Sequence, residues 1–175
     1  MVTIEIIANI RTLPCPRLEC VNLVSRLSHH RIPVLKSTKI INIANFLTSI
    51  GCVGTNGTKF PAIRQLFEEN ISKVYNNVDV SMTTWPADGV SRDVEAYKSA
   101  IDSLPRGSAI TVFTPDTTHY EIAMYAIERG VHVMVTKPIV MTVEAHKRVI
   151  EAARRNGVYV QIEVHKRYDP VYADA

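Results

Sequence analysis

Cysteine is scarce in this sequence, and long apolar runs are missing. The three cysteines among 175 residues form no CxxC pair, so a disulfide framework is disfavoured and reduced thiols are expected. No run of about 18 apolar residues supplies a membrane-spanning helix. The first ten residues carry Glu5 and lack the basic start of a signal peptide. These absences favour a cytoplasmic protein that binds no membrane.

Charge of one sign is not concentrated in the chain either. The formal net charge is +3, and Lys and Arg alternate with Asp and Glu, which gives little support to nucleic-acid binding. His29 and His30 are adjacent and so point in different directions on any regular element, and no second ligand pair stands at zinc spacing. The sequence therefore predicts no metal site. Its 46% hydrophobic and 21% charged residues are typical of one folded globular domain.

Glycine is absent from residues 1–50, and Pro14, Pro16 and Pro33 interrupt that region without regular spacing. We therefore interpret residues 1–50 as an irregular or atypical N-terminal segment. From about residue 58 onward, helix-like and strand-like patterns alternate, as they do in α/β proteins whose parallel sheet is covered by helices. Helices are predicted over 61–74, 93–104, 119–129 and 142–157, and strands over 78–83, 109–113, 131–135 and 158–164.

Several residues mark where these helices begin and end. Thr142 is a predicted N-cap, and Gly130 and Gly157 stand where a left-handed C-cap belongs. Thr118 and Glu121 have the spacing of a capping box, which predicts reciprocal hydrogen bonds at the start of the helix over 119–129.

A glycine-rich run, GCVGTNGTKFP, lies between an apolar stretch and a predicted helix. Its glycines, Gly51, Gly54 and Gly57, would let a backbone approach a pyrophosphate, to which the amides of the next helix could donate. The spacing fits neither G-x-G-x-x-G nor the P-loop pattern that would place Lys59 beside a phosphate. Two interpretations stay open: contact with a phosphate or nucleotide, and a turn that needs glycine only for its backbone geometry.

Polar segments follow the last three predicted strands: Thr114–His119, Thr136–Pro138 and His165–Pro170. Because the carboxyl ends of parallel strands share one edge, and ligands of open α/β sheets bind there, we expect one binding edge. Pro138 would hold Lys137 extended, so that its ammonium group could bind a substrate hydroxyl. Each segment taken alone could also be an ordinary helix cap or a solvated surface turn.

Three segments, Phe113–His119, Ala126–Val133 and Lys137–Pro138, resemble in order and spacing the pattern TPxxxH, AlxxGkHV, EKP of the Gfo/Idh/MocA family of NAD(P)-dependent oxidoreductases. His165–Pro170 is similar to the Asn-Arg-Arg-Phe-Asp-Pro-like run that follows the final Rossmann strand of that family. The resemblance implies an α/β fold with a doubly wound parallel sheet, Rossmann-like, over 51–170. Residues 171–175 would then begin a second, substrate-binding domain that this chain lacks.

The resemblance also implies a function and a set of site residues. The cofactor would be NAD or NADP, the reaction hydride transfer, and the substrate a sugar, polyol or related alcohol; a homo-oligomer is expected if a C-terminal domain exists. Lys137 and His165 would be the catalytic residues. The residues that would bind the cofactor are Gly54, Thr55, Asn56, Gly57, Thr58, Lys59, Thr114, Pro115, Asp116, His119, Lys137, Pro138 and Arg167.

Departures from the family pattern keep other functions open. The G-x-G-x-x-G loop is missing from residues 1–50, and Thr136 stands where the family usually has Glu. The chain also stops at Ala175, where the domain that normally supplies the catalytic histidine should begin. The alternatives are a non-catalytic protein of the same fold that senses a dinucleotide or sugar, and a truncated, inactive gene product.

Overall fold

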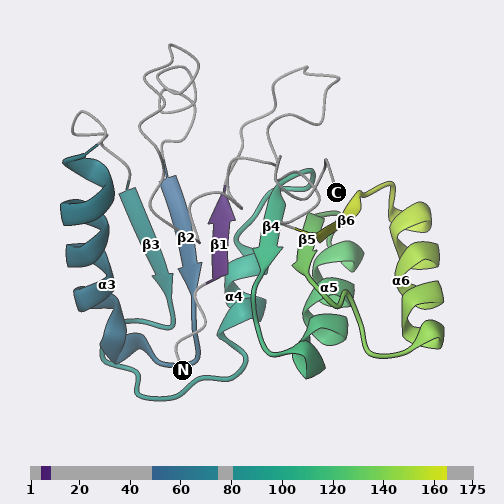
Figure 1. Cartoon of the computed structure of the whole chain (residues 1–175), viewed down its shortest axis with the longest axis horizontal. Coiled ribbons are helices and arrows are strands. Elements are labelled where there is room, and N and C mark those ends of the chain that lie inside the picture. Colours follow the sequence, from purple (N-terminus) through teal and green to yellow (C-terminus); the bar gives the residue numbers. More distant parts are fainter. Residues whose placement is uncertain (1–4, 9–48, 75–80, 165–175) are drawn as a thin grey trace, which may run out of the picture.

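The computed structural model describes residues 5–8, 49–74 and 81–164, which form a six-stranded sheet flanked by helices (Figure 1). The strands lie in the order β3-β2-β1-β4-β5-β6. Their bounds are β1 Glu5–Ala8, β2 Ser49–Val53, β3 Ser81–Trp85, β4 Ala109–Val112, β5 His132–Thr136 and β6 Val160–Glu163. The helical elements are η2 Gly57–Lys59, α3 Phe60–Phe67, η3 Glu68–Ser72, α4 Ala96–Asp102, η4 Asp116–Thr118, α5 His119–Glu128 and α6 Val143–Asn156.

Five of the six strands point the same way, and β1 runs against them, as the reversed arrow in Figure 1 shows. β2 and β3 are parallel, as are β4, β5 and β6, whereas β1 is antiparallel to both β2 and β4. The predicted doubly wound, Rossmann-like α/β sheet is thus confirmed, with one reversed strand at its centre. Apolar patterning could not predict this reversal, because antiparallel pairing satisfies the same backbone groups as parallel pairing.

Helices cover both faces of the sheet because β2 buries side chains on each. Ile50 and Cys52 pack with Phe60 of α3, whereas Val53 belongs to the larger core together with Ala100 of α4. Successive side chains of a strand point to opposite faces, so α3 and α4 lie on opposite faces of β2. Burial raises the pKa of the Cys52 thiol to about 11, which keeps this thiol protonated and weakly reactive.

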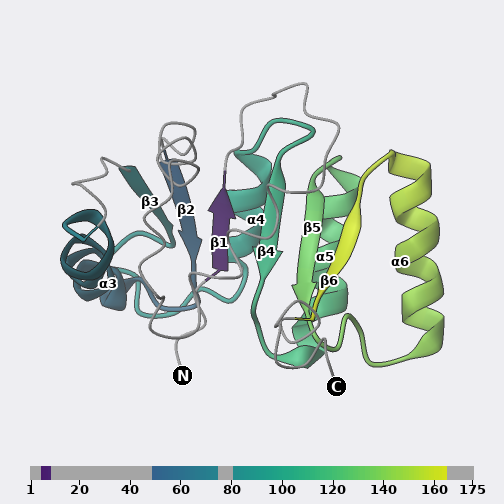
Figure 2. The ribbon, with the colours of Figure 1, turned by 45° about the horizontal axis from the view of Figure 1, so that its top comes forward.

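The larger core lies between the sheet and helices α4, α5 and α6, two of which are seen behind the middle strands in Figure 2. Ala123 and Ala126 of α5 are fully buried, and their small side chains let α5 pack against β4 and β5. Ile127 and Val135 are also fully buried. Burying an aliphatic side chain of this size contributes about 1.5–3 kcal/mol.

Three predicted helix ends are confirmed. Gly130 and Gly157 have φ angles of 72° and 66°, a left-handed conformation that glycine adopts without the steric cost of a Cβ. Thr142 accepts a hydrogen bond at Oγ1 from the N–H of Ala145 at 3.2 Å, so it caps α6 as predicted.

The predicted capping box at the start of α5 is wrong. Thr118 makes no side-chain hydrogen bond to the helix backbone as an N-cap. Glu121 instead accepts a hydrogen bond from the Tyr97 hydroxyl at 2.7 Å, which ties α5 to α4. Burial, followed by this hydrogen bond, raises the pKa of Tyr97 above its ordinary value. Capping-box spacing does not show whether a better partner lies on a neighbouring helix.

Two helix boundaries also differ from the prediction. The helix predicted over 61–74 leaves the α conformation after Phe67 and continues as the π-helix η3. The helix predicted from Asp93 begins only at Ala96, because Asp93 Oδ1 accepts the N–H of Glu95 at 2.9 Å and holds a turn there. Such local side-chain bonds compete with the helix. Of the strand predicted over 78–83, residues 78–80 lie outside the described part.

No helix in the described part of the chain is long and apolar enough to cross a membrane. Within the same residues, no group of three or more His, Cys, Asp and Glu side chains is placed to hold a metal ion.

His132 joins the start of β5 to the residue before β6 through its ring. The Tyr159 backbone N–H donates to His132 Nδ1 at 2.9 Å, so the hydrogen bond requires an Nδ1 that carries no proton. Burial lowers the pKa of His132 below its ordinary value of 6.5. As the pH falls below 6.5, His132 is therefore protonated more readily in the unfolded chain than in the folded chain, and this difference favours unfolding.

We expect the free energy of unfolding to fall as the pH is lowered from about 7.5 to about 5.5, and the variant His132→Phe to flatten this dependence. At the higher pH this variant should lose about 1 kcal/mol, since it removes one hydrogen bond. Denaturant titrations at several pH values measure both effects. Tyr159→Phe is the matched control, because it keeps the backbone donor and should keep the wild-type pH dependence. If His132→Phe lowers the free energy of unfolding by the same amount at every pH, so that the wild-type pH dependence remains, the prediction is wrong.

Candidate functional site

Three turns lie at one edge of the sheet because the strands before them end level. Ile7 of β1 pairs with Gly51 of β2 on one side and with Ile110 of β4 on the other. Val112 of β4 pairs with Val135 of β5. The parallel strands β2, β4 and β5 therefore finish together, at what we call the carboxyl edge, which is where open α/β sheets bind ligands.

The turn after β4, residues 113–118, is closed by a hydroxyl group; we call it the Thr114 turn. Thr118 Oγ1 lies 2.7 Å from both Thr114 Oγ1 and the carbonyl oxygen of Pro115. The Thr118 N–H also donates to that carbonyl, at 2.9 Å. Pro115 and Asp116 are exposed, and Thr114 is half-buried. The turn therefore has a fixed backbone and presents polar side chains at the carboxyl edge.

The turn after β5, residues 137–138, is called the Lys137 turn. Lys137 and Pro138 are both exposed and are joined by a cis peptide bond. The next two residues, Ile139 and Val140, are buried in the larger core. The turn is therefore anchored on one side by β5 and on the other by packed side chains, while the Lys137 side chain reaches solvent at the carboxyl edge.

His119 lies beneath these two turns rather than on the surface of the edge. It begins α5 and has no solvent exposure. Its Nδ1 lies 2.7 Å from the carbonyl oxygen of Pro138, and its Nε2 lies 2.9 Å from the carbonyl oxygen of Thr114. The ring thus contacts the backbone of both turns.

The glycine-rich loop after β2 uses much of its backbone within the protein. The N–H of Gly54 donates to the carbonyl oxygen of Trp85 at the end of β3, at 2.9 Å. The N–H of Gly57 donates to the carbonyl oxygen of Val90, in the loop that follows β3, at 2.8 Å. Thr58 N–H donates to Asn56 Oδ1 at 3.0 Å. A Cβ on Gly57 would lie 2.0 Å from the carbonyl oxygen of Ala87, so packing against that loop is enough to require glycine here. These three amides are not directed at a ligand.

The direction of β1 changes what the centre of the carboxyl edge can offer. Glu5 at the amino end of β1 pairs with Val53 at the carboxyl end of β2, so Ala8, the last residue of β1, lies toward the opposite edge. A glycine loop that follows the central strand, as in a dinucleotide-binding fold, therefore cannot be supplied by β1. In the loop after β2, the side chains of Thr55 and Lys59 are exposed. A nucleotide contact in this loop would therefore be made by side chains, and it stays a prediction.

Two of the predicted site residues, His165 and Arg167, lie outside the described residues. The other predicted residues fall into two groups: Thr114, Pro115, Asp116, His119, Lys137 and Pro138 come together around β4 and β5, and Gly54, Thr55, Asn56, Gly57, Thr58 and Lys59 lie after β2. Sequence order alone could not separate them, because β1 inserts between β2 and β4.

Sequence reasoning missed a carboxylate beside the Lys137 turn. Thr136 pairs with Glu163 across β5 and β6, and Thr136 Oγ1 donates to Glu163 Oε2 at 3.3 Å. Glu163 is 8% exposed. Thr136 occupies the position of the family's usual Glu, so the acidic group near this turn comes from the neighbouring strand instead. In the strand predicted over 158–164, Glu163 alternates with the apolar Ile162 and Val164, and this pattern gave no sign that Glu163 was buried.

A second missed feature is an arginine that fixes the loop facing the glycine-rich turn. Arg64 of α3 donates to both carboxylate oxygens of Asp88, at 2.8 and 2.6 Å, and to Thr84 Oγ1 at 3.0 Å. The hydrogen bond from Arg64 holds the pKa of Asp88 below its ordinary value. The partners lie 20 and 24 residues apart in sequence, so no local spacing could have revealed them.

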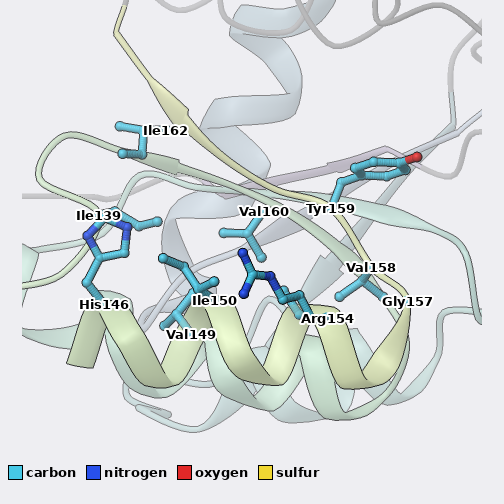
Figure 3. Close-up of a pocket in the computed structure, with 11 residues that line it drawn as sticks. Ile139, His146, Val149, Ile150, Arg154, Gly157, Val158, Tyr159, Val160 and Ile162 are labelled. Atoms are coloured by element: carbon cyan, nitrogen blue, oxygen red, sulfur yellow. The ribbon is translucent and has the colours of Figure 1, made fainter. Parts of the chain in front are cut away.

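A groove of about 450 Å³ lies between α6 and β6, and Ile139, which directly follows the Lys137 turn, is one of its lining residues (Figure 3). Aliphatic side chains form most of its lining, to which His146, Arg154 and Tyr159 also contribute. None of the described residues predicted to bind the cofactor lines it.

Comparison with known proteins decides the family. Residues 48–164 match the sequence model of an oxidoreductase family with an NAD-binding Rossmann fold. The chain belongs to the Gfo/Idh/MocA family. The match includes every described strand except β1. Both the Thr114 turn and the Lys137 turn therefore lie within the Rossmann domain of a Gfo/Idh/MocA protein.

Relatives in this family act on polyols and sugars. Scyllo-inositol 2-dehydrogenase (NAD(+)) of Bacillus subtilis is 35% identical over 94 residues, which are 51% of this chain and 28% of the relative. D-glucoside 3-dehydrogenase of Escherichia coli is 36% identical over 59 residues, or 34% and 17% of the two chains. A solved oxidoreductase from Bacillus cereus is 30% identical and aligns with a TM-score of 0.43, covering 62% of this chain and 27% of that one. The chain thus spans less than a third of the length of each.

Proposed function

We propose that this Gfo/Idh/MocA protein binds NAD or NADP at the carboxyl edge of β4 and β5 and takes part in hydride transfer with a sugar, polyol or related alcohol. The observation that carries this proposal is the meeting of the Thr114 turn and the Lys137 turn, whose backbones are joined by the buried His119 ring. The names of the relatives, an inositol dehydrogenase and a glucoside dehydrogenase, support the substrate class.

The residues of the two turns fit the nicotinamide side of such a cofactor. Thr114 and Pro115 would line the pocket, while Asp116 lies exposed beside them. When bound, the nicotinamide ring supplies the acceptor for the hydride. Lys137 would donate a hydrogen bond from Nζ to the oxygen of the reacting hydroxyl and so stabilise the negative charge that develops there as the hydroxyl proton is released to water. The exposed Thr55 and Lys59 would contact the phosphate or ribose side.

The test is a binding titration of the full chain with NAD, NADH, NADP and NADPH, followed by hydrogen exchange with and without the tightest ligand. We expect saturable binding, and slower exchange in residues 113–118 and 137–140. Residues 105–108 lie at the opposite edge and serve as the internal control, because their exchange should not change. Absence of binding by all four nucleotides, or protection confined to the opposite edge, would overturn the proposal.

A second candidate, a dinucleotide-binding protein without turnover, is favoured by one observation. In the described part of the chain, reversed β1 supplies no glycine loop at the central position of the carboxyl edge, where such a loop positions a pyrophosphate. Assays of the full chain with inositols and glucosides distinguish the two functions. Turnover supports the oxidoreductase, whereas saturable nucleotide binding with no turnover across this panel supports the second candidate.

A further inference from the structure

His119 meets two backbone carbonyls that belong to different turns. The Nδ1 contact with Pro138 O is 2.7 Å long, and the Nε2 contact with Thr114 O is 2.9 Å long. A carbonyl oxygen only accepts hydrogen bonds, and a neutral imidazole carries one N–H, so the tautomer sets which of the two carbonyls receives the hydrogen bond while the other ring nitrogen packs against its carbonyl. The side chain is fully buried, so water cannot take its place at either carbonyl. The ring therefore acts as a clamp between the two turns.

The position of His119 makes this clamp rigid. It is the first residue of α5, whose next turn carries the buried Ile122 and Ala123. The helix cannot shift without disturbing the larger core, to which both residues belong. A ring held in this way sets the distance between the Thr114 turn and the Lys137 turn, and small errors in such distances can cost about 10²-fold in rate.

We infer that His119 is the positioning residue that holds Lys137 in register with the Thr114 turn, acting through the carbonyls of Pro138 and Thr114 rather than by touching cofactor or substrate. The link to Lys137 chemistry rests on the proposed function. The clamp itself is a property of the free protein, so the two can be tested separately.

Two conservative variants separate the arms of the clamp. The amide nitrogen of asparagine lies three bonds from Cα, as Nδ1 does, and that of glutamine lies four bonds from Cα, as Nε2 does; both amides donate hydrogen bonds. His119→Asn should therefore keep the contact with Pro138 and lose the one with Thr114. His119→Gln should keep the contact with Thr114 and lose the one with Pro138.

Hydrogen exchange of the free proteins tests the clamp. In His119→Asn, amides 113–118 should exchange faster while amides 137, 139 and 140 keep their protection, and His119→Gln should show the reverse. Kinetics test the positioning of Lys137: His119→Gln should lose kcat by about 10²-fold with unchanged nucleotide affinity, whereas His119→Asn should weaken nucleotide affinity and keep most of kcat. Equal exchange in both turns and equal kinetic losses in the two variants would reduce His119 to a stabilising core residue and overturn the inference.

Two other results of these experiments also test the clamp: neither variant folds, or the wild-type chain binds no nucleotide. If neither variant folds, a scalar coupling across a hydrogen bond in labelled wild-type protein should connect a ring nitrogen with the carbonyl carbon of Thr114 or of Pro138, and absence of both couplings overturns the clamp. If the wild-type chain binds no nucleotide but exchange separates as expected, the clamp stands and the proposed function fails.

Discussion

Replacing Lys137 with alanine is expected to lower kcat by about 10²- to 10⁴-fold, the usual contribution of a positioned group that assists proton transfer. The affinity for NAD or NADP should change far less, because Lys137 is proposed to act on the substrate hydroxyl. Lys137 is exposed at the carboxyl edge, so the variant should keep the wild-type stability. Steady-state kinetics with an inositol or glucoside substrate, together with nucleotide titration, measure both quantities.

The matched control is Lys147→Ala, which removes an exposed lysine from α6 and should leave kcat and KM unchanged. Lys137→Arg keeps the positive charge but changes the shape of the donor group, so it should retain part of the lost rate. A Lys137→Ala variant with wild-type kcat would contradict the role proposed for this residue. A loss of nucleotide affinity alone would make Lys137 a cofactor-binding residue instead.

The second large effect is expected at Gly57, where alanine should destabilise the fold by about 2–3 kcal/mol, as overpacked sites do. The added Cβ would lie 2.0 Å from the carbonyl oxygen of Ala87 and 2.8 Å from its carbonyl carbon. Backbone atoms cannot turn aside as a flexible side chain can, so one of the two loops must move. The hydrogen bond from Gly57 N–H to Val90 O, 2.8 Å long, would be strained by that movement. Denaturant unfolding measures the loss.

Two other glycines serve as controls for this prediction. A Cβ on Gly89, in the same loop as Ala87, would meet nothing within 4 Å, so Gly89→Ala should change stability by less than about 0.5 kcal/mol. Gly107 also faces open space but has a φ of 83°, so Gly107→Ala isolates the conformational cost of about 1 kcal/mol. Equal stability of Gly57→Ala and Gly89→Ala would contradict the prediction, because it would show that the loops that contain Gly57 and Ala87 can move apart at little cost.

Much of the candidate site follows from one rule about parallel strands. The Thr114 and Lys137 turns were expected at one edge because each follows a strand of the predicted parallel sheet, and β4 and β5 indeed pair with Val112 opposite Val135. The function of His119 could not be read in the same way. A histidine on the first turn of a helix can face solvent, a ligand or the core, and only the tertiary structure showed it between two carbonyl oxygens.

The glycine-rich loop shows the opposite limit. Its sequence left open whether glycine served a phosphate or the backbone, and the contact of Gly57 with Ala87 supplies a packing reason that depends on a segment 30 residues away. Such contacts between distant segments leave no periodic pattern in the sequence. The same holds for the pairing of Thr136 with Glu163, which places a buried carboxylate on β6 where a family-like Glu on β5 is missing.

By itself, the sequence determined the α/β class, the ends of α6, the glycine that closes α5, and the family. Those features depend on local rules: apolar periodicity, the left-handed φ of Gly130 and Gly157, the Thr142 cap and motif spacing. Only the tertiary structure decided the reversed direction of β1, the clamp formed by His119 and the packing role of Gly57. These depend on which backbone groups meet across the sheet and between loops, and hydrogen-bonding groups that are identical in every residue carry no trace of their partners in the sequence.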